Sequence, residues 1–263
     1  MDLNLKSKVA LVCAASEGLG KAAALELAKE GSKVAICSRN KEKLFLAKQE
    51  IVNETGAVVE TFEADLSIHK DIKELHADVE KKLGEIEVLV NNVGGPPPGT
   101  FENLSDEDWQ IAINLTMMSA LRMSHLVLPK MKEKKWGRII NISSVSVKTP
   151  VRNLFLSNSI RLGVLGWAKA LSDEVGKDGI TVNTVCPGST RTNRITTLFS
   201  VTAKETGQTL KEIEKISAQS IPMRRIGEPQ ELAALIAFLA SERASYMTGL
   251  AIQVDGGSAR GYF

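Results

Sequence analysis

Two pairs of residues in this chain have the types and the spacing that chemistry requires. Gly18 and Gly20 follow the first apolar run and open an alanine-rich helical pattern. Glycines there let the backbone turn tightly and bring the amides and positive dipole of a helix N-terminus against a diphosphate. An ordinary strand-to-helix turn would use the same glycines, but their place after the first strand favours a phosphate-binding turn. Ser157 and Arg161 stand four residues apart, so one helix face would present a hydroxyl beside a guanidinium.

Short β-branched runs alternate with longer amphipathic stretches and must position these residues. We predict strands at residues 9–12, 33–37, 58–64, 87–92, 138–144, 180–187 and 250–255. We predict helices at residues 19–29, 41–54, 68–83, 106–131, 156–176 and 229–241. The strand runs are continuously apolar, as in a sheet buried on both faces. The pattern indicates an α/β, Rossmann-like, doubly wound parallel sheet of about seven strands with helices on both faces.

We expect residues 1–263 to form a single domain, because we find no internal repeat and no linker that marks a boundary. The segment at about 189–226 breaks the alternation, since it is rich in Ser, Thr and Arg and only weakly helical. A surface extension of the core would have this composition too. We favour a substrate lid, because ligands of open α/β sheets bind outside the carboxyl ends of the strands.

Several motifs make the chain resemble the short-chain dehydrogenase/reductase family over nearly its whole length. They are the turn from Cys13 to Gly20, Asp65-Leu66, Asn91-Asn92-Val93-Gly94, Cys186 to Thr192, and Asp255-Gly256-Gly257. The resemblance is closest to the 3-oxoacyl-[acyl-carrier-protein] reductase-like branch. The family turn reads Thr-Gly-x-x-x-Gly-x-Gly, and here Cys13 and Ala14 replace its Thr and first Gly. An alanine fits there if the backbone of Ala14 stays at negative φ.

The resemblance implies a bound nicotinamide dinucleotide. The residues that would hold it are Ala14, Ser16, Gly18, Leu19, Gly20, Ser38, Arg39, Asp65, Leu66, Asn92, Gly94, Pro187, Gly188, Thr190 and Thr192. Relatives that prefer NAD place an Asp at the end of the second strand, where this chain has Ser38 followed by Arg39. A serine and an arginine accept a 2′-phosphate that a carboxylate would repel, so we favour NADP(H) over NAD(H). Glu17 is a contrary sign, because many NADP-dependent relatives carry a basic residue there.

The family works with four catalytic residues: Asn, Ser, Tyr and Lys. The first two match Asn114 and Ser144. Counting onward from Ser144 at the family spacing reaches Ser157 and Arg161, where the family has its Tyr and Lys. The only tyrosines of the chain, Tyr246 and Tyr262, lie elsewhere, so the resemblance implies an active site that lacks the usual Tyr and Lys.

This substitution predicts altered proton delivery. A serine hydroxyl is far less acidic than a tyrosine phenol, and a guanidinium does not give up its proton near neutral pH. Arg161 would instead hold ribose hydroxyls or stabilise an oxyanion. Losing general-acid help slows a reaction by ~10²–10⁴-fold, so the enzyme would be slow rather than dead. Lys148 or an ordered water held by Asn114 and Ser144 are alternative proton sources, whereas His125 is expected in the core or at an interface.

Three functions compete on these grounds. The first is an NADP(H)-dependent oxidoreductase that interconverts a small-molecule carbonyl and an alcohol. The second is a non-catalytic dinucleotide-binding protein with a redox-sensing or scaffold role. The third, a lyase-like relative, is disfavoured because Gly18, Gly20, Asp65 and Asn91 indicate a retained nucleotide pocket.

The bulk composition excludes other classes of protein. The net charge of +2 shows none of the concentrated basic footprint of a nucleic-acid binder. The first apolar run is too short for a membrane span or a signal sequence, and we expect a cytoplasmic protein. Cys13, Cys37 and Cys186 each end a strand run and are expected to be buried thiols rather than metal ligands. The helices at 106–131 and 156–176 match those that build homodimers and homotetramers in the family, and Leu162, Leu165 and Trp167 would cover such an interface.

Overall fold

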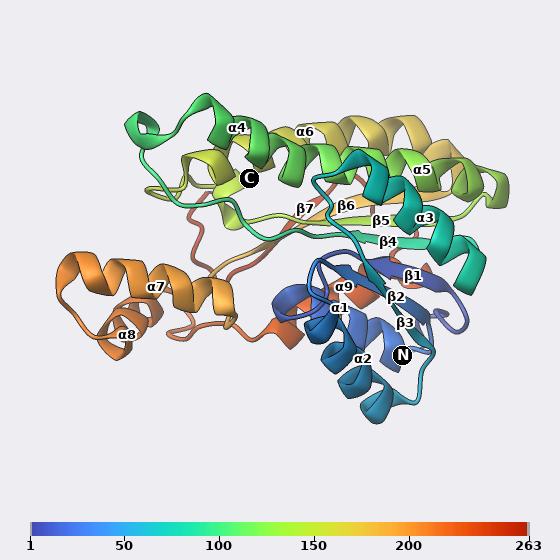
Figure 1. Cartoon of the computed structure of the whole chain (residues 1–263), viewed down its shortest axis with the longest axis horizontal. Coiled ribbons are helices and arrows are strands. Elements are labelled where there is room, and N and C mark those ends of the chain that lie inside the picture. The colour runs from blue at the N-terminus through green and yellow to red at the C-terminus, as the bar shows by residue number, and fades with distance from the viewer. Residues whose placement is uncertain (1, 262–263) are drawn as a thin grey trace.

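The computed structural model describes residues 2–261, and its centre is one parallel sheet of seven strands, as predicted (Figure 1). The strands are β1 (Val9–Val12), β2 (Lys33–Ser38), β3 (Val59–Glu63), β4 (Val88–Asn91), β5 (Gly137–Ile142), β6 (Ile180–Pro187) and β7 (Ala251–Val254). Their order is β3-β2-β1-β4-β5-β6-β7, and every neighbouring pair is parallel. The order reverses at β1, so a crevice opens outside the carboxyl ends of β1 and β4, where ligands of such sheets bind.

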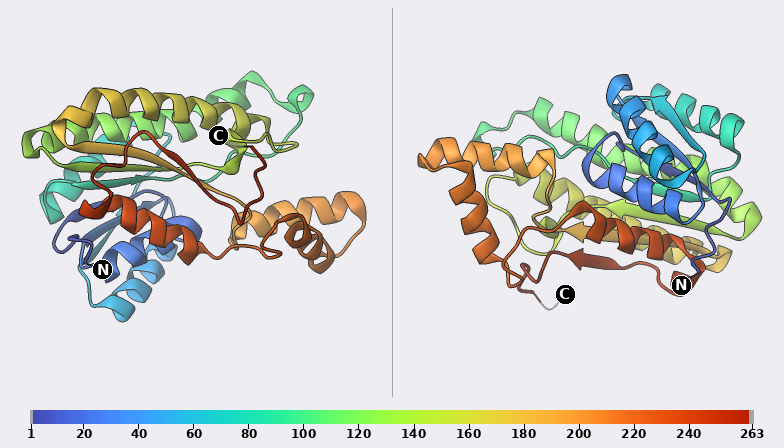
Figure 2. Two further views of the ribbon diagram at one scale, coloured as in Figure 1. Left: turned by 180° about the vertical axis from the view of Figure 1, so that it is seen from behind. Right: turned by 90° about the horizontal axis from the view of Figure 1, so that it is seen from below.

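Alternate residues of β1 face opposite helical layers. Ala10 and Val12 pack in one core with α1 (Gly18–Lys29), α2 (Lys41–Thr55) and α9 (Pro229–Ala240). Val9 and Leu11 pack in the other core with α3 (His69–Leu83), α5 (Ser119–Lys134) and α6 (Phe155–Val175). Figure 2 shows the sheet between these two layers from behind and from below. Both faces are therefore covered, which is why the strand runs are continuously apolar.

Some helices begin at a side-chain cap and others, including α1, do not, and the uncapped start of α1 bears on function. The side chain of Asn40 accepts a bond from the amide of Lys43 (2.9 Å) and caps α2. At the start of α1, Glu17 makes no side-chain capping bond. Because the first amides of a helix have no partner inside it, those of α1 are left available to a ligand.

The prediction of one regular helix over residues 106–131 was wrong, because the helix is interrupted by a π-helical stretch. The segment is α4 (Asp106–Ala112), a π-helical stretch Ile113–Met118, and α5. Such a stretch adds one residue per turn and cannot be read from apolar periodicity. By length and composition alone, residues 106–134 could cross a membrane. Here they pack against α3, α6, β4 and β5 in one of the two helical layers.

The segment predicted at about 189–226 contains two ordered helices, α7 (Asn193–Thr206) and α8 (Leu210–Ser220). They project from the body of the molecule in Figures 1 and 2. No residue of α7 is buried, and Ile213 is the only buried residue of α8. Since few buried residues join this segment to the core, we expect its local stability to be low.

Candidate active site

A cavity of about 520 Å³ lies outside the carboxyl ends of the strands. Its wall contains every predicted site residue except Gly20 and Asn114, namely Ala14, Ser16, Gly18, Leu19, Ser38, Arg39, Asp65, Leu66, Asn92, Gly94, Ser144, Ser157, Arg161, Pro187, Gly188, Thr190 and Thr192. Residues from six strand ends thus meet around one space, although they are spread over most of the chain. Asn114 lies in the π-helical stretch and is half-buried, and its neighbour Leu115 reaches the wall instead.

Gly20 lies beneath the cavity and brings two chain segments together. A Cβ atom on Gly20 would stand 2.5 Å from the carbonyl oxygen of Ala14 and 2.8 Å from Nδ2 of Asn92. Real Cβ atoms do not approach other atoms so closely, so only glycine fits. Asn92 Nδ2 also donates to the Ala14 carbonyl (3.2 Å), which ties the turn after β1 to the end of β4. The turn is therefore fixed relative to β4, and so is the start of α1 with its uncapped amides.

The condition under which an alanine would fit at position 14, a negative φ, is not met. Its φ is +47°, in the left-handed region that favours glycine. The amide of the next residue, Ala15, donates to Cys37 (3.0 Å), and the Ala14 carbonyl accepts from Asn92. These bonds on both sides impose the conformation, and a left-handed residue with a Cβ costs about 1–2 kcal/mol. The turn thus keeps the shape of a glycine turn without the glycine.

The end of the cavity at β2 combines polar and charged groups. Ser38 and Arg39 lie there, and Arg39 is mostly exposed and 3.8 Å from Asp65. Glu17, the contrary sign for NADP(H), pairs with Lys43 at 2.8 Å. This hydrogen bond from Lys43 lowers the pKa of Glu17. Lys43 also lines the cavity. Its positive charge offsets the negative charge of Glu17, which we expected to disfavour binding of a 2′-phosphate.

Ser144, Ser157 and Arg161 share the wall near the end of β5. Arg161 is buried, and its Nη1 donates to the carbonyl oxygens of Ile142 (3.1 Å) and Ser143 (3.2 Å). Desolvation, followed by the positive charge of Arg194, lowers the pKa of Arg161 to about 10, so the side chain remains a cation at neutral pH. One nitrogen is thus anchored on the backbone, and the remaining N–H groups are available for hydrogen bonds at the cavity.

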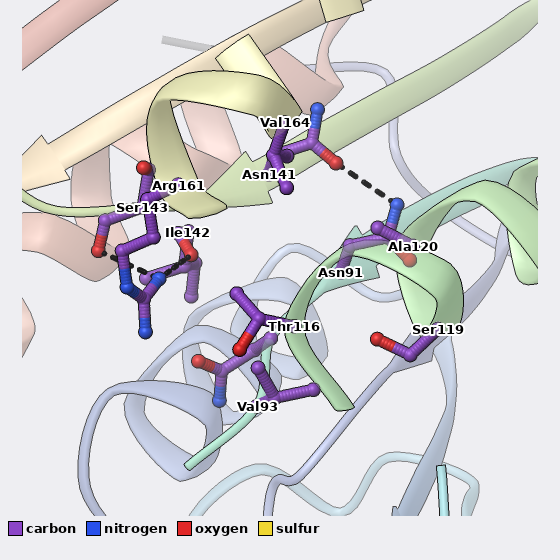
Figure 3. A pocket seen from close by; sticks show the side chains of 11 residues that line it. Asn91, Val93, Thr116, Ser119, Ala120, Asn141, Ile142, Ser143, Arg161 and Val164 are labelled. Carbon is purple, nitrogen blue, oxygen red and sulfur yellow. Dashed lines mark hydrogen bonds between the residues drawn. The ribbon is translucent and has the colours of Figure 1, made fainter. Parts of the chain in front are cut away.

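A second cavity of about 20 Å³ touches Arg161 (Figure 3). Asn91 donates to the side-chain oxygen of Asn141 (3.0 Å) beside it. Three buried atoms around it have no protein partner: Asn141 Nδ2, Thr116 Oγ1 and Ser143 Oγ. The volume suits one water molecule, and polar cavities of this kind bind one. The π-helical stretch thus supplies Thr116 to a polar space that borders the guanidinium.

Other predicted candidates lie away from these groups. His125 is exposed on α5, which excludes the core but leaves an interface open. Tyr246 is fully exposed, and Tyr262 lies outside the described residues. Lys148 is half-buried and does not line the cavity.

The three cysteines are buried and unpaired, as predicted. Cys186, at the end of β6, is close enough to Lys148 and Arg161 for their charges to act on its thiol, but burial dominates and raises its pKa to about 11. A thiol held neutral in this way is a packing group.

Several residues on the wall of the cavity were not predicted from the sequence. The most consequential are Lys43, Leu115, Leu154, Arg194 and Leu198. Arg194 follows Thr192 by two residues, but no local pattern shows that its side chain turns inward. It donates from Nη2 to the carbonyl of Pro96 (2.7 Å), a contact across 98 positions of the chain. Tertiary contacts of this length leave no periodic signal in the sequence.

Comparisons with known proteins agree with this geometry. The family model described as "Enoyl-(Acyl carrier protein) reductase" matches residues 13–259. The chain is 33% identical to the NADPH-dependent reductase BacG of Bacillus subtilis, over 97% of this chain and 99% of that protein. It is 32% identical to the 3-oxoacyl-[acyl-carrier-protein] reductase FabG of Aquifex aeolicus, over 98% and 99% of the two chains.

Solved structures are similar over the full length as well. YwfH, an NADPH-dependent reductase involved in bacilysin biosynthesis, superposes with a TM-score of 0.93 at 33% identity, covering 97% of this chain and 100% of that one. L-sorbose reductase from Gluconobacter frateurii, complexed with NADPH and L-sorbose, superposes with a TM-score of 0.94 at 30% identity, covering 99% and 100%. The fold is therefore the one that these reductases have.

Proposed function

The chain belongs to the short-chain dehydrogenase/reductase family, and from this we propose that it is an NADP(H)-dependent oxidoreductase that interconverts a small-molecule carbonyl and an alcohol. One observation carries the proposal: a single cavity joins the phosphate turn, the Ser38–Arg39 end and the Ser144–Ser157–Arg161 wall. Relatives named as NADPH-dependent reductases support the choice of cofactor. They also favour a catalyst over the alternative, a non-catalytic redox-sensing or scaffold protein.

The residues present fit a dinucleotide phosphate. The uncapped amides at the start of α1 suit the diphosphate, and the absence of a side chain at Gly20 keeps the turn close to β4. Ser38 and Arg39 would hold the 2′-phosphate, with Lys43 adding a positive charge beside them. When bound, the cofactor supplies or accepts the hydride. Asp65, Leu66, Asn92, Gly94, Pro187, Gly188, Thr190 and Thr192 would bind and orient the rest of it.

Ser157 and Arg161 stand, in this proposal, where relatives keep a Tyr and a Lys. The Arg161 cation would stabilise negative charge that develops on the substrate oxygen, because it is buried, charged and already oriented by two carbonyls. The hydroxyls of Ser144 and Ser157 would donate hydrogen bonds to the same oxygen. Neither hydroxyl can replace a phenol as the acid, so an ordered water that exchanges protons with solvent would relay the proton to the substrate oxygen.

The small polar cavity supports this route for the proton. A water held by Asn141, Thr116 and Ser143 would lie beside Arg161. Asn114 would contribute through the π-helical stretch that brings Thr116 to this space, rather than from the cavity wall. The expected result is a slow reductase whose rate-limiting difficulty is protonation.

Residues 189–226 act as the lid in this proposal. Thr192, Asn193, Arg194, Ile195 and Leu198 line the cavity from the first half of α7. The rest of α7 and α8 has Ile213 as its one buried residue, so the segment would move without disrupting the core. Closure over the cofactor and substrate would exclude bulk water from the reacting atoms.

The test is direct. Titration with NADPH, followed by its fluorescence, should give saturable binding that is tighter than binding of NADH. Turnover on a panel of ketones and aldehydes should then be measurable and slow. Saturable NADPH binding with no turnover on any compound would support the non-catalytic alternative. Absence of NADPH binding would refute both functions.

A further inference from the structure

Two arginines line the cavity without an acidic partner. The other charged groups on the wall are paired: Glu17 with Lys43 at 2.8 Å, and Asp65 with Arg39 at 3.8 Å. Within residues 2–261, neither Arg161 nor Arg194 lies within 4.0 Å of a carboxylate oxygen. Desolvating a cation is costly unless it is paired, so two such groups at one cavity indicate an anionic ligand.

The guanidinium of Arg194, on the wall of the cavity, is held by the loop after β4. Arg194 projects from the first turn of α7 and donates from Nη2 to the carbonyl of Pro96 (2.7 Å) in the loop after β4. A Cβ on Gly95 would stand 3.1 Å from Nε and 3.2 Å from Cζ of Arg194, so the absence of a side chain at Gly95 leaves room for the guanidinium. Desolvation lowers the pKa of Arg194, and its charge also acts on Arg161. The two guanidinium groups therefore face a common space.

Among residues 2–261, no carboxylate is available to this space. Asp255 is near enough to Cys186 for its charge to act on that thiol, but its carboxylate already accepts bonds from the amides of Gly257 (2.9 Å) and Ala259 (2.8 Å) and from the Ser258 hydroxyl (3.1 Å). The diphosphate of the proposed cofactor has its own donors at the start of α1. Leu115, Leu154 and Leu198 supply apolar surface on the same wall.

We propose that the substrate is an oxo acid whose carboxylate is bound by Arg194, in the positive field of Arg161, with its hydrocarbon part against Leu115, Leu154 and Leu198. This assignment rests on the proposed function, because it places the substrate in the cofactor cavity. An arginine fork matches a carboxylate in a bidentate manner, and its anchor on Pro96 pre-orients it. Since Arg194 comes from the lid, the carboxylate would also draw the lid closed.

The test compares oxo acids with neutral analogues. A panel would include 4-oxopentanoate, 2-oxo-4-phenylbutanoate and phenylpyruvate, each beside its methyl ester. The wild type should favour the acids in kcat/KM by about tenfold to a hundredfold, the range for hydrogen bonds to a charged group. Arg194→Met should remove most of this preference, and Arg194→Lys should retain part of it. Lys204→Met, which removes an exposed charge from the same helix, is the control and should keep the wild-type preference.

A second measurement decides the case if no panel member turns over. A saturable change in the fluorescence of bound NADPH on addition of each acid or its ester, without release of the NADPH, reports ternary binding directly. Acids that bind no tighter than their esters would overturn the proposal. So would an Arg194→Met variant that loses NADPH affinity tenfold or more with an unchanged acid-to-ester ratio, because Arg194 would then serve the diphosphate. Failure of NADPH to bind the wild type would instead refute the proposed function.

Discussion

The side-chain amide of Asn92 donates a 3.2 Å hydrogen bond to the carbonyl oxygen of Ala14, joining positions 78 residues apart. This bond links the turn after β1 to the end of β4 at the point where the strand order reverses. Gly20 packs beneath it, within reach of both partners. The phosphate turn is therefore held in shape by two distant segments of the chain. The contributions of Ala14 and Gly20 to it can be tested separately.

Replacing Ala14 with glycine should stabilise the protein. Removing the Cβ from the left-handed residue stabilises the folded state by about 1–2 kcal/mol. The greater backbone freedom of glycine stabilises the unfolded state by about 0.4–1 kcal/mol. The net gain in the free energy of unfolding is therefore about 0.5–1 kcal/mol. Urea unfolding of Ala14→Gly measures it. Ala15→Gly is the matched control, because Ala15 is buried at a φ that is not positive, and its change should destabilise. Equal effects of the two variants would contradict the strain at Ala14.

Replacing Gly20 with alanine should impair both folding and cofactor binding. The new Cβ would lie 2.5 Å from the Ala14 carbonyl and 2.9 Å from Cα of Ala15, both backbone atoms that move only with the turn. Overpacking of this kind costs about 1–3 kcal/mol. Thermal unfolding and NADPH titration of Gly20→Ala measure the two losses. Gly176→Ala, where a Cβ meets nothing within 4 Å, should cause neither.

Restoring the family pair should accelerate carbonyl reduction. The double variant Ser157→Tyr, Arg161→Lys would place a phenol beside an amine on one face of α6, where a nearby cation tunes the phenol toward neutral pKa. We expect at least about a tenfold rise in kcat on a neutral ketone, a fraction of what general-acid help provides. Ser157→Tyr alone is the control and should gain less, because Arg161 cannot relay protons. A double variant no faster than the wild type would show that the register or the proton route is different.

The stability of the protein at alkaline pH should depend on Cys186. Burial raises the pKa of this thiol from 9.0 to about 11. The folded state therefore keeps a proton that the unfolded chain releases, so the contribution is complete below pH 9 and is lost as the pH rises toward 11. Cys186→Ala should lower the slope of unfolding free energy against pH, by about 1 kcal/mol between pH 8 and 10. Identical slopes for wild type and variant would contradict the raised pKa.

The lid should exchange its amide protons faster than the core. Helix α7 has no buried residue and α8 has only Ile213, whereas α9 has Leu232, Ile236 and Leu239 in the core. Local opening of α7 and α8 is thus expected at a free energy well below that of global unfolding. Hydrogen exchange measures this, and saturating NADPH with an oxo acid should slow exchange in α7 while α9 stays unchanged. Equal protection of α7 and α9 in the free protein would argue against a mobile lid.

Elements defined by local periodicity were predicted closely. β1 at residues 9–12 and β6 at 180–187 match the predicted bounds, because a strand buried on both faces must be a continuous apolar run. The face shared by Ser157 and Arg161 follows from the helical repeat alone, and both residues line the cavity. The π-helical stretch at Asn114 was not predictable, since one inserted residue barely alters the apolar pattern.

The order of residue types along the chain was enough to predict the family and the parallel sheet, because these depend on residue type and short-range spacing. Three features were decided only by the tertiary structure: the left-handed φ of Ala14, the inward course of Arg194 to Pro96, and the polar space beside Arg161. Each depends on atoms brought together from distant positions. Packing and hydrogen bonds across such distances overrode the local preference of the residues that they hold.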